Sequence, residues 1–83
     1  MKTAREMFEE LGYEEYIEDE INLNITTLIR DRGYTSYIVF FDAEKLVRVH
    51  DLSVYSDIEP HYITLKELQA INQMVKELGW LDD

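Results

Sequence analysis

The side chains best suited to chemistry in this 83-residue chain lie in one short stretch of histidines and carboxylates. Imidazole nitrogens and carboxylate oxygens both bind metal ions, so a zinc site is one interpretation of this stretch. Catalytic zinc usually takes three ligands from rigid elements, whereas this stretch is typical of a loop that ends at a proline. We therefore expect no metal ion and no other cofactor. The residues concerned are His50, Asp51, Asp57, Glu59 and His61.

Other catalytic patterns find no support in the sequence. A nucleophilic serine needs a histidine and an acid beside it, and no such pattern surrounds Ser36, Ser53 or Ser56. The three glycines lie far apart, which excludes a glycine-rich phosphate loop. We therefore expect a protein that is not an enzyme.

Acidic charge is concentrated near the N-terminus. The net charge is −10, and residues 1–20 hold −6 of it, with two basic and eight acidic side chains. A calcium loop would have oxygen ligands at alternating positions and a central glycine, which the acidic run lacks. The carboxylates of this run are Glu14, Glu15, Glu18, Asp19 and Glu20.

Two interpretations of the acidic run remain open. Charge runs are usually solvated connections between elements. Clustered carboxylates can also imitate a phosphate backbone and occupy the basic groove of a nucleic-acid-binding protein. Direct binding to nucleic acid or to an anionic membrane is disfavoured, because the chain has no basic cluster beyond Arg30 and Arg32.

The composition also predicts where the protein resides. The charged N-terminal residues are unlike a signal peptide, and no apolar run approaches the ~18 residues that a membrane span needs. The chain has no cysteine, which suits a reducing compartment. We expect a cytoplasmic protein with a single small domain over residues 1–83.

Two matched helix signatures lie at the ends of the chain. In each, a threonine is followed three residues later by a glutamate, so that each residue can cap a free backbone N–H group of the first turn. These pairs are Thr3 with Glu6 and Thr64 with Glu67. A glycine ends each helix, and an aromatic residue follows it. The predicted buried stripes are Ala4, Met7, Phe8 and Leu11 in the first helix, and Leu65, Leu68, Ile71, Val75 and Leu78 in the second.

The central block of the chain has the pattern of β-strands. Residues 21–30 alternate, with Ile21, Leu23, Ile25, Thr27 and Ile29 on the face expected to be buried. Two further strands are expected over residues 37–41 and 46–50, with connections at 31–33 and 42–45. Short connections favour hairpins, so we predict an α+β fold of helix, three-stranded antiparallel meander and helix, arranged in two layers.

The middle strand of this predicted sheet is apolar on both faces. If the helices cover Ile38 and Phe40, then Tyr37, Val39 and Phe41 lie on the other face, with Val47 and Val49 as further candidates for it. An exposed apolar patch of this kind is unusual on a monomer, so something should cover it. The cover could come from the connecting segments of the chain, from a second copy, or from a different protein.

Three segments carry a resemblance to known proteins. Residues 3–13 read TAREMFEELGY, residues 37–41 read YIVFF, and residues 63–80 begin ITLKELQAI and end ELGW. With these segments, the chain resembles small uncharacterised proteins of phages and prophages of Gram-positive bacteria. The resemblance implies a bacterial cytoplasm and a protein that acts on a host or phage protein, and it brings no catalytic residue.

The sequence leads to two hypotheses about function. The first is a protein-interaction module that binds itself or a protein partner through the apolar sheet face around Tyr37, Val39 and Phe41. The second is an acidic inhibitor or regulator of a nucleic-acid-binding protein that acts through the carboxylates of residues 14–20. Neither hypothesis includes a small-molecule substrate.

Overall fold

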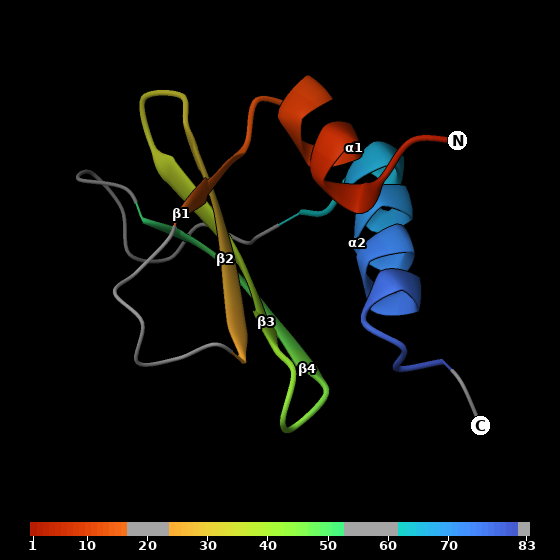
Figure 1. Ribbon diagram of the computed structural model, residues 1–83. Coiled ribbons are helices and arrows are strands. Elements are labelled where there is room, and N and C mark those ends of the chain that lie inside the picture. The colour runs from red at the N-terminus through yellow and green to blue at the C-terminus, as the bar shows by residue number, and fades with distance from the viewer. Residues whose placement is uncertain (17–23, 53–61, 82–83) are drawn as a thin grey trace.

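A computed structural model describes residues 1–16, 24–52 and 62–81 of the chain. Two helices and four strands follow one another in the order α1, β1, β2, β3, β4, α2 (Figure 1). The helices are α1 (Ala4–Glu10) and α2 (Leu65–Glu77), and the strands are β1 (Glu14–Tyr16), β2 (Ile25–Asp31), β3 (Thr35–Phe41) and β4 (Leu46–Leu52).

The four strands form one antiparallel sheet in the order β1-β2-β3-β4. The α+β class and the position of β3 between its two predicted neighbours are confirmed. The expected number of three strands is wrong, because β1 pairs with β2 and places Glu15 opposite Leu28. β1 could not be predicted, because its three residues Glu14–Tyr16 show no apolar alternation.

Tight connections join the strands close to the predicted places, although Asp31, predicted in the first connection, is the last residue of β2. Gly33 has a φ of 81° between β2 and β3, a left-handed conformation that glycine adopts without steric cost. Lys45 has a φ of 58° immediately before β4. Both hairpins keep strict one-to-one register, from Asp31 opposite Thr35 to Phe41 opposite Leu46.

The predicted buried face of β2 is wrong. Leu28 is 2% exposed and lies in the core, whereas Ile25 is 38% exposed. Directly opposed residues of an antiparallel pair share a face, and the register sets Leu28 opposite Ile38. The alternation of β2 therefore marks the face that points away from the core; Ile21 and Leu23 lie outside the described residues.

Both helices have the predicted caps. The Thr3 hydroxyl accepts a hydrogen bond from the Glu6 amide at 3.2 Å, and the Thr64 hydroxyl accepts one from the Glu67 amide at 3.1 Å. At each C-terminal end the aromatic amide donates to the carbonyl five residues earlier, Tyr13 to Phe8 and Trp80 to Val75. This pairing is the Schellman motif, in which a left-handed glycine turns the chain out of the helix.

The buried stripe predicted for α1 is confirmed, whereas the stripe predicted for α2 is partly wrong. Ala4 and Phe8 are fully buried in α1. In α2, Leu65 and Leu68 are 70% and 54% exposed, and the buried residues are Glu67, Ala70 and Met74. Polar contacts of Glu67 in the interior account for this rotation, as described below. Ile71, Val75 and Leu78 are partly buried beside the core.

The core joins the two helices to β2 and β3. It contains Phe8 of α1 and Met74 of α2 together with Leu28, Ile38 and Phe40 of the strands. Val47 and Val49 of β4 pack against this core, so their expected place on the other face of the sheet is wrong. Both helices lie to one side of the sheet in Figure 1. The two-layer arrangement as such stays a prediction. Neither helix of the described residues has the length and apolar character needed to cross a bilayer.

Candidate partner-binding surface

The face of the sheet that points away from the core carries a continuous row of apolar and aromatic side chains. We call it the open face. Since Ile38 and Phe40 lie in the core, the alternation of β3 sends Tyr37, Val39 and Phe41 to the open face. Opposed residues of neighbouring strands join them there. These neighbours are Ile29 and His50 beside Tyr37, Thr27 and Arg48 beside Val39, and Ile25 and Leu46 beside Phe41.

The centre of the open face is less exposed than its edges. Val39 is 5% exposed, although it lies outside the core cluster that the helices share, and Tyr37 and Phe41 are half-buried. The exposed apolar side chains lie around this centre: Tyr16 at 54%, Ile25 at 38%, Leu46 at 59% and Leu52 at 57%. The open face is therefore an apolar surface with a packed centre and an accessible rim.

Two ring contacts order the aromatic residues of the open face. The Tyr37 and His50 rings stack with centroids 4.7 Å apart and planes inclined by 10°. The Arg48 guanidinium lies over the Phe41 ring at 5.5 Å, within the range of a cation–π contact. Both contacts join β3 to β4, so the rings are held against the sheet. Ordered rings cost little entropy when a partner binds to them.

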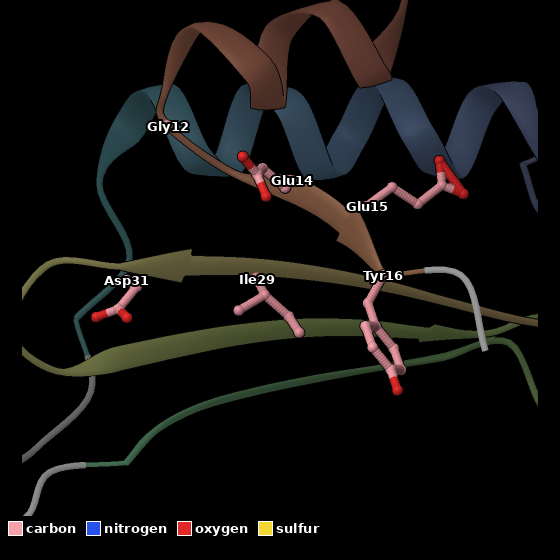
Figure 2. Close-up of a pocket in the computed structure, with 6 residues that line it drawn as sticks. All are labelled: Gly12, Glu14, Glu15, Tyr16, Ile29 and Asp31. Carbon is pink, nitrogen blue, oxygen red and sulfur yellow. The ribbon is translucent and has the colours of Figure 1, made fainter.

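The acidic residues of β1 lie at one edge of the sheet. Glu14, Tyr16, Ile29 and Asp31 lie along β1 and β2 and line a shallow pocket of about 300 Å³ together with two neighbouring residues (Figure 2). Glu15 is not a free carboxylate, because Arg5 Nε of α1 donates to its Oε1 at 2.6 Å. Two of the five predicted carboxylates are thus placed on this edge, and one of them already has a basic partner.

The remaining sequence candidates fall outside the described residues. They are Glu18, Asp19 and Glu20 of the acidic run, and Asp57, Glu59 and His61 of the possible metal stretch. Among residues 1–16, 24–52 and 62–81, no three histidine, aspartate or glutamate side chains come together in a way that could hold a metal ion.

A buried polar network that the sequence did not reveal joins α1, β2 and α2. Tyr13 Oη donates a hydrogen bond to Glu67 Oε2 at 2.6 Å, and Arg30 lies 3.7 Å from the same oxygen. The Arg30 guanidinium also lies 4.6 Å from the centre of the Tyr13 ring and donates to the Leu11 carbonyl at 3.3 Å. Glu67 is 2% exposed, so its charge needs these partners.

The network shifts two pKa values. Burial raises the pKa of the Tyr13 hydroxyl, and its hydrogen bond to Glu67 raises it further. Burial alone would raise the pKa of Glu67 as well, but hydrogen bonds from Tyr13 and Thr64 and the charge of Arg30 hold it below its ordinary value. Glu67 is thus stabilised as a carboxylate, as a capping residue and ion-pair partner requires.

These contacts give the network a structural role. The side chains of the network contact one another, and two of its residues also end helices. Glu67 caps α2 through Thr64, and the Tyr13 amide completes the end of α1. A sequence signal for Glu67 existed in its capping position, but nothing in the sequence indicated that the same carboxylate reaches Tyr13, 54 residues away.

Comparison with known proteins adds no relative. No protein-family model matches the chain, and neither a curated protein nor a solved structure does.

Proposed function

We propose that the chain is a non-enzymatic protein-interaction module. In this proposal the two helices form one layer against the sheet, and the open face of the sheet binds another protein. The observation that carries the proposal is the composition of the open face: an ordered aromatic centre at Tyr37 and Phe41, surrounded by exposed apolar side chains at Ile25, Leu46 and Leu52. Clustered apolar side chains that remain exposed on a sheet are typical of protein interaction sites.

The burial of Val39 determines which substitution is a fair test. A charge introduced at a residue that is 5% exposed would destabilise the fold itself. Phe41 is half-buried and close to the rim, so Phe41→Asp changes the surface with less cost to the fold. Leu65→Asp is a matched control, because Leu65 is an exposed apolar residue in the first turn of α2, where an acidic residue is favourable.

The experiment is an affinity capture of partners from a lysate of a Gram-positive bacterium, the source that the resemblance suggests. The tagged protein is used as bait, and captured proteins are washed at rising salt. An apolar interface resists salt, so the proposal expects the partner to remain bound at high salt and to be lost with Phe41→Asp. A partner retained equally by Phe41→Asp and by wild type would contradict the proposal.

The alternative is an acidic inhibitor or regulator of a nucleic-acid-binding protein. The placement of Glu14 on an exposed edge strand next to Asp31 favours it, whereas the pairing of Arg5 with Glu15 reduces the free negative charge there. This alternative expects a captured partner that dissociates steeply as salt rises and that competitor DNA releases. A Glu14→Lys bait would then lose the partner, and Phe41→Asp would keep it.

A further inference from the structure

Two stripes of side chains with the same spacing run along nearly opposite sides of α2. The residues of the inner stripe are Glu67, Ala70, Met74 and Glu77. The residues of the outer stripe, each two positions earlier in the chain, are Leu65, Leu68, Asn72 and Val75. Because each residue of a helix is turned by about 100° from the one before it, the two stripes lie about 200° apart around the helix.

The rest of the chain covers the inner stripe. Ala70 and Met74 are fully buried in the core. Glu67 accepts a hydrogen bond from the Tyr13 hydroxyl, and Glu77 Oε2 accepts one from the Ala4 amide at 2.7 Å. Both ends of α1 are thus held by carboxylates of the inner stripe. The helix α1 and the core therefore lie on the inner side of α2 (Figure 1).

The outer stripe is largely open to solvent. Leu65 and Leu68 are 70% and 54% exposed, Asn72 is also exposed, and Val75 is partly buried. None of the four side chains carries a charge, although the chain as a whole has a net charge of −10. The outer stripe is therefore an uncharged and mainly apolar surface against which another helix can pack.

We propose that α2 of a second copy of this chain packs in parallel along the outer stripe. The stripe advances by three, four and three residues, the spacing at which helices pair side by side. In a parallel pair each residue of the stripe faces its own counterpart, so leucine covers leucine and Asn72 faces Asn72. The two amides can donate to and accept from each other, and a single asparagine in such a contact fixes a two-stranded, in-register pair.

The distribution of apolar residues favours the parallel direction. Tyr62 and Ile63, 79% and 45% exposed, extend the apolar surface just before the helix, so all the strongly exposed apolar side chains of this region lie at the N-terminal end of α2. A parallel pair brings these two ends together. An antiparallel pair along the whole helix would instead set the exposed leucines against Asn72 and the partly buried Val75.

The distribution of charge favours a second copy on this side of the molecule. Two copies with a net charge of −10 repel each other unless their acidic parts stay apart. The acidic helix α1 lies on the inner side of α2, so it stays on the far side of each copy in the proposed pair. The open face of the sheet is on another side again. The pairing therefore holds whether or not the open face binds a protein, and it goes beyond the proposed function.

The test uses single cysteines, which is simple because the chain has no cysteine of its own. Leu68→Cys, Asn72→Cys and the control Lys66→Cys are each oxidised mildly by themselves. Lys66 is an exposed residue of the same helix that lies outside the stripe. In the proposed pair, identical positions of the stripe face each other closely enough for a disulfide. Leu68→Cys and Asn72→Cys should therefore each form a linked dimer, and Lys66→Cys should not.

The same variants test the direction of the pair. In an antiparallel pair that brings Leu65 of one copy to Leu68 of the other, the two copies of residue 72 lie about 16 Å apart along the helices. That separation is too large for a disulfide. Failure of Asn72→Cys to cross-link, or cross-linking of Lys66→Cys to the same extent as the stripe variants, would overturn the inference.

Sedimentation equilibrium measures the strength of the pair without a cross-link. A helix of 13 residues is about 20 Å long, so the interface is small and we expect a weak dimer. Salt screens the repulsion between the acidic copies, so the dimer should become tighter as salt rises. Leu65→Glu places a charge in the contact and should weaken the dimer about tenfold or more, whereas Lys66→Gln should not. A wild type that stays monomeric up to about 1 mM at every salt concentration would also overturn the inference.

The outcomes separate this inference from the proposed function. A dimer that cross-links at positions 68 and 72, but captures no partner through Phe41, supports the helix pairing and contradicts the binding role of the open face. A monomer that captures a salt-resistant partner through Phe41 supports the binding role and contradicts the helix pairing.

Discussion

The two faces of the sheet are built from alternate residues of the same strands, yet they differ in completeness. On the helix side, Ile38 and Phe40 are 0% and 1% exposed and are enclosed by α1 and α2. On the open face, Val39 is packed, but Phe41 is half-buried and Leu46 is 59% exposed. The helices of the chain cover the first face, whereas the second face keeps exposed apolar side chains at its rim.

In the proposed function, this difference lets a small chain combine a stable core with a binding surface. About eighty residues bury little more than 60% of their unfolded surface, so one complete core uses much of the apolar content. The apolar residues that remain on β3 and β4 add little to that core. In the proposed function, these residues contact another protein.

The largest expected difference between the faces is in stability. Phe40→Ala should lower the free energy of unfolding by about 3–5 kcal/mol, because it leaves a cavity beside Phe8 and Trp80. Phe41→Ala should cost about 1 kcal/mol, since Phe41 is only half-buried. Urea unfolding followed by circular dichroism measures both. Equal losses would show that the open face is as complete as the helix side.

Loss of a polar contact should also lower the free energy of unfolding more on the helix side than on the open face. Glu67→Gln removes the negative charge that Tyr13 and Arg30 face in the interior, and it should cost about 1–3 kcal/mol. Arg48→Gln on the open face loses one cation–π contact and should cost about 0.5–1 kcal/mol. The same urea titrations compare the two variants; a larger loss for Arg48→Gln would reverse the comparison.

The helix side should further show a specific dependence on pH. The folded pKa of Glu67 lies below its ordinary value. Its charge therefore stabilises the fold fully at any pH above the unfolded pKa of about 4.3. That contribution is lost as pH falls through the folded pKa. The gap in unfolding free energy between wild type and Glu67→Gln should therefore shrink on acidification. A gap that grows at low pH would contradict the assignment.

The smallest effects are expected at the rim of the open face. Ile25→Gln and Leu46→Gln replace side chains that are 38% and 59% exposed, so each should change the free energy of unfolding by about 0.5 kcal/mol or less. Thermal unfolding followed by circular dichroism would detect a larger change in stability. A loss of several kcal/mol would mean that these side chains belong to a finished core and are not available for binding.

Local signals in the sequence predicted much of the fold. The threonine and glutamate pairs predicted both helix starts, and Gly12 and Gly79 predicted both ends, because capping depends on residues a few positions apart. The separation of Ile38 and Phe40 from Tyr37 and Phe41 followed from the two-residue period of a strand. Each of these predictions needed only neighbours along the chain.

The errors came from contacts between distant parts of the chain. β1 exists because Glu15 pairs across to Leu28, and no alternation within residues 14–16 announces it. Leu65 and Leu68 were expected in the core because they are apolar, but Tyr13 and Arg30 draw Glu67 inward instead. The spacing of apolar residues considers each side chain by itself, whereas the face that a helix buries depends on the contacts of all its side chains together.

Binding of a protein to the open face of the sheet is the proposal that most needs a test. The most direct measurement compares three baits in one capture experiment: wild type, Phe41→Asp and the control Leu65→Asp. We expect a partner that wild type and Leu65→Asp retain equally and that Phe41→Asp loses, while all three baits have the same circular dichroism spectrum. A partner that stays with Phe41→Asp and leaves with Leu65→Asp would place the binding surface on α2 and contradict binding by the open face.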